Sequence, residues 1–320
     1  DRALHAPFEL EREPPFRWIV VRTGEVRWLW GQVYHHVALD GQSGWMVSNR
    51  VAESYSALLE GKPLPLYPPN GLPALLKEEA DYRRSPRFDE DRRYWLSRLD
   101  GCDRMRSRSH RPSGTPAINS VLRETHHLPA PLSASVRDLA RAAGLRSEHL
   151  LMAAVAVLEA AYQGQQDVLL GTQVLGRLAS AVKAFPGMAA NECHIPLTVS
   201  PTMSFEELAT QVSRCIRGAL RHQSYRYEDL RNDLGLLPDS PDYFGVSVNI
   251  MPVASDLRFT GLDCSSNFLS FGPVRDLSLR VFDNRELPRL RVDLDGNGAR
   301  HGQADLQRYL EQIVFILAQV

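Results

Sequence analysis

The sequence predicts a mixed α/β (α+β) fold, because segments with the residue pattern of strands alternate with segments of helical periodicity. Two neighbouring segments, at 15–22 and 26–37, are rich in β-branched and aromatic residues, as strands are. Gly24 and Glu25 lie between them, which is typical of a hairpin turn. No G-x-G-x-x-G or Walker sequence is present, so the pattern does not indicate a doubly wound nucleotide-binding fold.

A helix is predicted directly after Asp40-Gly41. Apolar residues repeat there at helical spacing, and Gly61 follows them as a stop signal. The repeating residues are Val47, Val51, Tyr55, Leu58 and Leu59. We expect Ser43 to cap the N-terminus of this helix rather than to act as a nucleophile, because no G-x-S-x-G pattern surrounds it.

The middle of the chain contains the candidate boundary between two lobes. A loop rich in proline and glycine is expected at 61–73, followed by a charged helix over 74–99 that is broken near Pro86. The stretch 101–119 is rich in serine, arginine and proline. A chain of 320 residues is long enough for two hydrophobic cores, so we place the boundary between the lobes within this stretch.

The rest of the chain again alternates between strands and helices. Ser204 and Glu207 have the spacing of a capping box, which predicts a helix that runs to about 221. The other elements expected are strands at 120–128, 167–174, 244–251, 277–283 and 289–295, and helices at 132–143, 148–163 and 304–319.

Composition excludes several classes of function. With 37 basic and 38 acidic side chains the formal net charge is −1, so nothing indicates binding to nucleic acid or to an anionic membrane. The four cysteines are scattered without a C-x-x-C pair, which fits a reducing cytoplasm and not a zinc or dithiol site. No apolar run is long enough to span a membrane, and the N-terminus lacks signal-peptide character. The first residue is not methionine, so we interpret the chain as a piece of a longer protein.

The best candidates for catalytic residues form one run, His35-His36-Val-Ala-Leu-Asp40-Gly41. Imidazole suits acid-base catalysis near neutral pH, and Asp40 could orient a histidine or pair with an arginine. If the doublet lies on a strand, its side chains point to opposite faces, so only one histidine can serve a given site. Gly41 would permit a close backbone approach or a positive φ. From these residues alone, three interpretations of the doublet remain open: structural histidines, a general base, or part of a metal site.

This run resembles the HHxxxDG motif of condensation domains from nonribosomal peptide synthetases, which are relatives of chloramphenicol acetyltransferase. Further segments resemble that family in the expected order along the whole chain. They are the strand that ends in Gly176-Arg177, the segment 186–196 with Asn191, the segment 222–228 that begins with His222-Gln223, the segment 243–249 that ends in Asn249, and the segment 272–278. Two of these, 168–177 and 272–278, resemble the corresponding segments of siderophore synthetases.

The resemblance implies two chloramphenicol-acetyltransferase-like lobes in a V-shaped pseudo-dimer. Residues 1–110 would be the C-terminal part of the first lobe, and 111–320 the second lobe. Two carrier proteins would each deliver a thioester on a 4'-phosphopantetheine arm into a tunnel between the lobes, and an adenylation domain would be a neighbour. The acceptor amine would attack the donor thioester to form a peptide bond, with no cofactor or metal bound by the domain itself.

The resemblance also assigns roles to individual residues. His36 would orient or deprotonate the amine or stabilise the charged intermediate, and the N–H of Gly41 would lie near the oxyanion. His35, Asp40 and Arg177 would be structural, with Asp40 and Arg177 forming an ion pair. Candidates for the tunnel wall are Asn191, Asn249 and His222, with His194 as a further histidine that could line it. Backbone capping is an equal alternative for the two asparagines.

The chain departs from the family pattern in several places. The family's first two motifs are absent, so the resemblance implies that most of the beginning of the first lobe is missing. Ala189 and Ala190 stand where the family has Phe and Val, and Ser224 stands where it has Asp. The histidine doublet disfavours a heterocyclisation domain, and Thr172–Arg177 differs from the corresponding stretch of epimerisation domains. The alternatives are an O-acyltransferase of the wax-ester-synthase type and a non-catalytic recruitment module.

Overall fold

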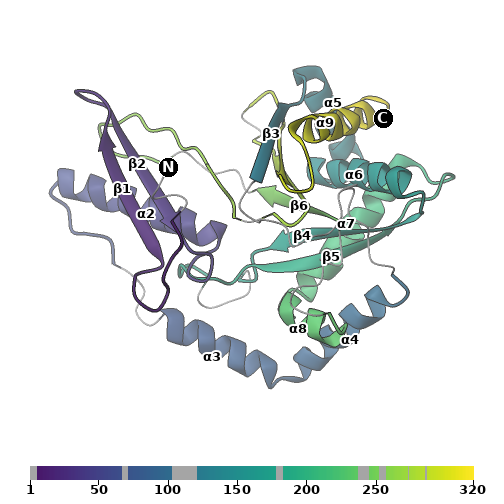
Figure 1. Cartoon of the computed structure of the whole chain (residues 1–320), viewed down its shortest axis with the longest axis horizontal. Helices are drawn as coiled ribbons and strands as arrows, with labels where there is room; N and C mark the ends of the chain where they lie inside the picture. Colours follow the sequence, from purple (N-terminus) through teal and green to yellow (C-terminus); the bar gives the residue numbers. More distant parts are fainter. Residues whose placement is uncertain are drawn as a thin grey trace. The chain divides into compact units, whose positions relative to one another are not determined.

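The chain forms two compact units, each built from segments that are distant in sequence (Figure 1). The first unit consists of Asp1–Arg83, Leu175–Ala190 and Ser255–Gly272, and the second of Arg84–Val174, Asn191–Ala254 and Pro273–Val320. The computed structural model describes residues 6–66, 71–102, 121–177, 183–236, 245–251, 257–272, 274–284 and 287–320. The expected lobe boundary near residue 110 lies outside these residues.

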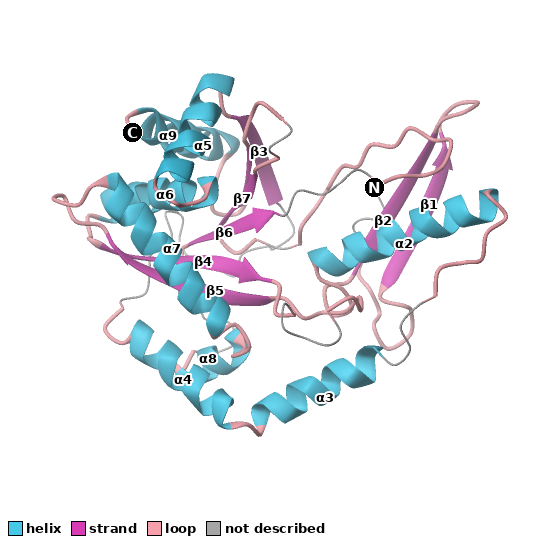
Figure 2. Cartoon of the chain, turned by 180° about the vertical axis from the view of Figure 1, so that it is seen from behind, coloured by secondary structure: helices cyan, strands magenta, loops and turns pink. Residues whose placement is uncertain are grey.

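The first unit is centred on a hairpin and a long helix. Strands β1 (Phe16–Arg22) and β2 (Trp28–Tyr34) pair antiparallel with Phe16 opposite Tyr34, which confirms the predicted hairpin. Helix α2 (Gly41–Leu59) follows β2 and lies beside the hairpin in both views (Figure 2). Strand β2 ends at Tyr34 and not at Val37 as expected, because residues 35–38 form a turn.

Two helices replace the single broken helix expected over 74–99. Helix α3 (Gly71–Arg83) belongs to the first unit, and α4 (Pro86–Leu99) belongs to the second. The break near Pro86 is confirmed, but α3 begins before residue 74. Pro73 did not prevent this because it lies in the first turn, where a helix does not need the N–H that proline lacks.

A segment from the last third of the chain completes the first unit. We name residues 257–272 the strap, because they run along the unit with little regular structure. The ring of Phe259 contacts Trp30 of β2 and Tyr55 of α2, with centroid separations of 6.1 Å and 5.5 Å. The backbone N–H of Thr260 donates a hydrogen bond to Ser56 Oγ at 2.9 Å. The strap is therefore attached to both the hairpin and α2.

The second unit contains a six-stranded mixed sheet in the described part of the chain. Its order is β3-β8-β7-β6-β4-β5, where β4/β6 and β6/β7 pair parallel and the other neighbours pair antiparallel. The strands are β3 (Val121–His127), β4 (Asp167–Val174), β5 (Asn191–Thr198), β6 (Val246–Met251), β7 (Leu277–Phe282) and β8 (Arg291–Asn297). The strands predicted for this sheet are thus present: β4 has the predicted bounds, and the ends of the others shift by no more than two residues.

Helices pack on this sheet and enclose the main hydrophobic core. They are α5 (Ala130–Ala142), α6 (Ser147–Gln163), α7 (Phe205–Arg221), α8 (Tyr227–Asp233) and α9 (Gln303–Ala318). Helix α6 lies between α7 and α9, and residues Leu150–Ala156 are buried all around it, as expected for a helix in the middle of a core. The capping box of Ser204 and Glu207 is confirmed at the start of α7.

The sequence did not predict β5 or α8. Strand β5 is an edge strand, and it carries Pro196 and several polar residues, so it lacks the usual apolar alternation. Helix α8 is only seven residues long, which is too short to show a helical period.

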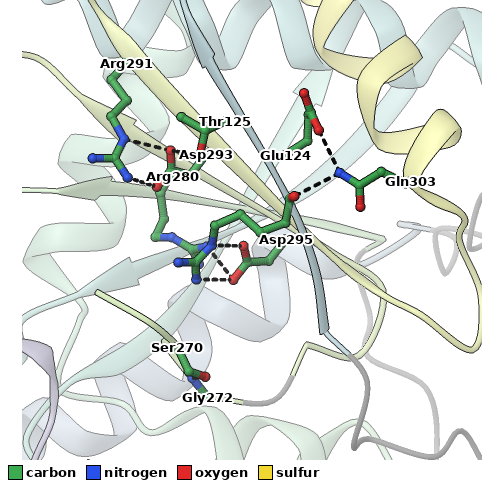
Figure 3. A network of polar contacts seen from close by, with 10 residues as sticks. Glu124, Thr125, Ser270, Gly272, Arg280, Arg291, Asp293, Asp295 and Gln303 are labelled. Carbon is green, nitrogen blue, oxygen red and sulfur yellow. Dashed lines mark hydrogen bonds and ion pairs between the residues drawn. The ribbon is translucent and has the colours of Figure 1, made fainter. Parts of the chain in front are cut away.

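Charged side chains form a network across β3, β8 and β7 (Figure 3). Asp295 is fully buried and accepts hydrogen bonds from Arg123 Nε at 2.7 Å and Nη2 at 3.0 Å, and it also pairs with Arg280. Asp293, likewise buried, pairs with Arg291 and accepts a hydrogen bond from Thr125 Oγ1 at 2.9 Å. Because Arg123 and Thr125 lie on β3 and their carboxylate partners on β8, these contacts help to hold β3 in register at the edge of the sheet.

Candidate active site

The histidine doublet lies in the turn that connects β2 to α2. The backbone of His35 donates to Pro15 O at 2.9 Å and accepts from Ala38 N at 3.0 Å. Its Nδ1 accepts from Val37 N at 3.1 Å, and its ring meets Phe8 edge-on. His35 is thereby fixed in the turn, and its structural role stays a prediction. Our argument from opposite strand faces was wrong, because neither histidine lies on the strand.

His36 differs from its neighbour in being exposed. In the part of the chain that the structure describes, its ring nitrogens make no hydrogen bond or ion pair. Gly272, at the end of the strap, lies near its ring, since a Cβ atom added there would be 3.8 Å from His36 Cδ2. The imidazole of His36 is therefore open to an incoming group, whereas that of His35 is occupied.

Asp40 caps helix α2, so the expectation that Ser43 is the cap was wrong. Asp40 has extended backbone angles, and its Oδ1 accepts from the backbone N–H of Ser43 at 2.9 Å. Gly41 is the first residue of α2 and has neither a positive φ nor a close neighbour, contrary to our expectation. Its N–H belongs to the first helical turn, where no carbonyl of the same helix can accept it.

The second carboxylate oxygen of Asp40 binds a distant part of the chain. Asp40 Oδ2 forms an ion pair with Arg177 Nη2 and accepts the backbone N–H groups of Ala189 and Ala190, each at 3.0 Å. Both charged side chains are almost completely buried. The ion pair is the one that the family resemblance implied. The two alanines that depart from the family pattern contribute through their backbone, so the change of side chain leaves these hydrogen bonds in place.

Arg177 and Ser43 form additional hydrogen bonds to the segment that contains Ala189 and Ala190. Arg177 donates to Phe185 O at 2.9 Å and to Gly187 O at 2.7 Å. Ser43 Oγ donates to Gly187 O at 2.7 Å and accepts from Gly187 N at 2.9 Å, which occupies the hydroxyl. We call Asp40, Ser43 and Arg177 the anchor. It fastens residues 185–190 to the N-terminus of α2.

The pKa of Asp40 reflects this environment. Burial alone would raise it, but the hydrogen bonds from Ala189 N and Ser43 and the charge of Arg177 outweigh burial and lower the pKa below its usual value. Asp40 is thus a carboxylate at neutral pH. A carboxylate that is buried and surrounded by donors supports the structure but is a poor proton carrier.

The tunnel candidates Asn191 and Asn249 both belong to the second unit, but only Asn191 is buried. The amide of Asn191 donates to Gln223 O at 2.9 Å and Tyr225 O at 2.7 Å, and its oxygen accepts from Tyr227 N at 3.0 Å. These hydrogen bonds are the backbone capping that we considered as the alternative. Asn249, on β6, donates to Gln173 Oε1 at 2.6 Å.

His222 lies at the C-terminus of α7, where it contacts α4. Its Nδ1 is 2.7 Å from Asp91, which is buried, and its ring stacks on Tyr94 at a centroid distance of 3.8 Å. Its carbonyl accepts from Trp95 Nε1 at 2.9 Å. His194 is fully buried, and burial lowers its pKa to about 3, so it is neutral at physiological pH. Among the residues that the structure describes, no three His, Cys, Asp or Glu side chains gather as metal ligands do.

Sequence reasoning missed the residues that hold the site together through their backbone. Gly176 has a φ of 65°, and a Cβ atom there would lie 1.9 Å from the carbonyl oxygen of Ala189. Gly71, at the start of α3, leaves room for the ring of Phe185. The only signal of these contacts in the sequence is the glycine itself, since the partners are far away along the chain.

Comparison with known proteins identifies the class. The family model of the condensation domain matches residues 1–320, and the chain belongs to this family. Condensation domains form amide bonds by acyl transfer, and those of nonribosomal peptide synthetases form peptide bonds. The described residues contain no helix that is long and apolar enough to cross a membrane.

Particular relatives support the same family. The chain is 35% identical over 314 residues to a dimodular nonribosomal peptide synthase of Bacillus subtilis (strain 168), covering 98% of this chain and 13% of the relative. It is 36% identical over 325 residues to an isonitrile lipopeptide synthase of Streptomyces coeruleorubidus, covering 100% and 22%. The solved first condensation domain of the CDA synthetase superposes with a TM-score of 0.85 at 30% identity, covering 98% of this chain and 68% of that one. The chain therefore spans less than a quarter of the length of the two synthases, and about two thirds of the solved condensation domain.

Proposed function

We propose that this domain joins a donor acyl or peptidyl thioester to the amine of an acceptor aminoacyl thioester. The observation that carries the proposal is the pairing of an exposed, unoccupied His36 with a buried anchor that starts four residues later. In the reaction the acceptor nitrogen attacks the thioester carbonyl, the C–N bond forms, and the C–S bond breaks. The donor arm leaves as a thiol, and the amine gives up a proton.

His36 would act on the attacking amine. It would orient or deprotonate that amine, or stabilise the charged intermediate, and a positioned imidazole contributes about 10²–10⁴-fold to such reactions. Holding two tethered substrates together would supply a further large part of the acceleration. The N–H of Gly41, at the free end of α2, would donate to the oxyanion, and a donor of this kind is worth about 3–4 kcal/mol.

His35, Asp40 and Arg177 would support the site without touching the substrate. His35 fixes the turn through Pro15 and Val37, and the anchor fixes the start of α2. Both constraints leave His36 and the N–H of Gly41 in defined places. We propose that Asn249 and His222 line the substrate tunnel and that Asn191 supports its wall. The two lobes that form the tunnel would be residues 1–110 and 111–320.

Both substrates would arrive on the 4'-phosphopantetheine arms of carrier proteins, in the cytoplasm, within an assembly that also holds an adenylation domain. The chain's relatives are multidomain synthases, which supports such partners. No cofactor bound by the domain itself enters the proposed chemistry.

The test is an assay of the domain with separately loaded donor and acceptor carriers. Mass spectrometry of the acceptor arm should detect an added acyl group together with loss from the donor arm. A parallel reaction with acyl-CoA and a long-chain alcohol tests the O-acyltransferase alternative, which the relatives do not favour. Ester without amide would overturn the proposal, and binding of both carriers without either product would indicate a recruitment module.

A further inference from the structure

The side chain of Gln32 connects the strand that leads into the histidine turn with the helix that follows the turn. Gln32 lies on β2, two residues before its end, and its Nε2 donates a hydrogen bond to Ser48 Oγ at 3.0 Å. Ser48 lies on α2, is buried, and donates to the carbonyl of Gly44 at 2.9 Å. The two elements lie side by side in both views (Figures 1 and 2). The amide of Gln32 therefore directly links the two elements that flank His36.

The oxygen of the same amide is also bonded. Gln32 Oε1 accepts a hydrogen bond from the hydroxyl of Tyr34, the last residue of β2. That hydroxyl accepts in turn from Trp18 Nε1 of β1 at 3.2 Å. Burial raises the pKa of Tyr34, so its hydroxyl stays protonated and can donate near neutral pH. We name Trp18, Tyr34, Gln32 and Ser48 the tie, because together they join both strands of the hairpin to α2.

The tie ends at the first turn of α2, where Gly41 lies. Gly44, whose carbonyl accepts from Ser48, donates its own N–H to Asp40 O at 2.9 Å. His36 lies in the turn formed by residues 35–38, between the end of β2 and this first helical turn. The anchor fastens the N-terminus of α2 to residues 185–190, and the tie fastens α2 to β2. The segment that carries His36 is therefore constrained at both of its ends.

A hydrogen-bonded amide fixes the spacing of two elements more sharply than an apolar contact does. Hydrophobic burial is non-directional, whereas a hydrogen bond requires a donor–acceptor distance of about 2.7–3.2 Å and a narrow range of angles. The surroundings of Gln32 are largely aromatic. Trp18 lies opposite Gln32 in the hairpin, and the ring of Trp18 meets that of Trp30 at a centroid separation of 5.8 Å. An amide at this place gives up apolar contact area and supplies a defined distance.

We propose that Gln32 is a positioning residue for condensation, which sets, through Ser48, the distance between the imidazole of His36 and the N–H of Gly41. The inference rests on the proposed function, in which these two groups act on the amine and on the oxyanion of one reacting centre. Both groups must be in place at the same moment, and a misplacement of about 1 Å costs about 10²-fold in rate. Gln32 would act through the two elements that it joins, without touching the substrate.

The experiment removes the hydrogen bond from either side. Gln32→Leu removes the amide but keeps a side chain of similar size, Ser48→Ala removes the hydroxyl, and Ser48→Thr keeps a hydroxyl and tests rescue. Asn49→Ala is the matched control. Asn49 donates to Trp45 O at 3.1 Å, so like Ser48 it bonds the carbonyl four residues earlier in α2, but the structure gives it no bond to β2. For each variant kcat and KM are measured with preloaded carriers, and thermal unfolding checks that the fold is intact.

We expect Gln32→Leu and Ser48→Ala each to lower kcat by about ten- to a hundred-fold, while KM for both carriers stays within about two-fold of the wild type. Asn49→Ala and Ser48→Thr should keep kcat within about three-fold. The double variant Gln32→Leu/Ser48→Ala should be no slower than the slower single variant, because both changes break the same bond. Wild-type kcat in the two single variants, an equal loss in Asn49→Ala, or multiplied losses in the double variant would overturn the inference.

A second measurement separates failure of the inference from failure of the proposed function. Nuclear magnetic resonance reports the amide of Gly41 and the imidazole of His36 without turnover. We expect both signals to shift in Gln32→Leu and neither to shift in Asn49→Ala, and unchanged signals in Gln32→Leu would contradict the positioning role. If His36→Ala keeps the wild-type rate, the proposed role of His36 fails. If His36→Ala is slow but Gln32→Leu is not, the inference alone fails.

Discussion

Asp40 and Arg177, which are 137 residues apart in the sequence, form a buried ion pair at the N-terminus of α2. The same carboxylate caps the helix and receives the backbone of Ala189 and Ala190. One side chain therefore joins the turn that carries His36 to the segment 185–190. The consequences of removing it follow from its burial.

Asp40→Asn should lower the free energy of unfolding by about 3–5 kcal/mol, because it leaves the buried guanidinium of Arg177 without its charge partner. Chemical denaturation measures this loss. Asp40→Ala also removes the cap, and we expect it to be poorly soluble as well as inactive. A well-folded, soluble Asp40→Ala protein without activity would instead favour a chemical role for Asp40.

The stabilisation by Asp40 should depend on pH in a defined direction. Its pKa is lowered in the folded state relative to about 3.9 in the unfolded chain, so its contribution is complete above that value. As the pH falls through the folded-state pKa, the contribution is lost. The difference in unfolding free energy between wild type and Asp40→Asn should shrink there, and a difference that grows with acid would contradict the assignment.

Gly176→Ala should destabilise the protein more than Gly164→Ala, although both glycines have nearly the same positive φ. At Gly164 no atom lies near the new Cβ, so only the backbone strain of about 1 kcal/mol applies. At Gly176 the Cβ meets the Ala189 carbonyl, which adds about 1–3 kcal/mol. Equal melting temperatures for the two variants would show that the segment 185–190 adjusts freely.

Asp295→Asn should lower the free energy of unfolding by about 3–5 kcal/mol, since Arg123 and Arg280 lose a buried partner. Asp138→Asn is the control, because its ion pair with Arg141 is solvent-exposed and worth less than about 1 kcal/mol. Denaturant titration of both variants gives the comparison. Similar small effects would mean that water reaches the arginines of the network.

Local patterns predicted the parts of the fold that depend on neighbouring residues. The hairpin, the helix after Asp40 and the cap of α7 by Ser204 each follow from signals within a few positions. The anchor could be anticipated only in part, since the partnership of Asp40 with Arg177 came from family resemblance. The backbone groups of Ala189 and Ala190 and the approach of Gly272 to His36 could not be predicted, because contacts over such separations leave no local pattern.

The central claim is that His36, and not the ion pair beside it, acts in catalysis. The most direct test is the rate of amide formation by His36→Ala with preloaded carriers, next to His35→Ala. We predict that His36→Ala lowers this rate by about 10²–10⁴-fold while its melting temperature and carrier binding match the wild type. His35→Ala should lower the melting temperature instead, because it loosens the turn. Product formation by His36→Ala at a rate near that of the wild type would contradict the account.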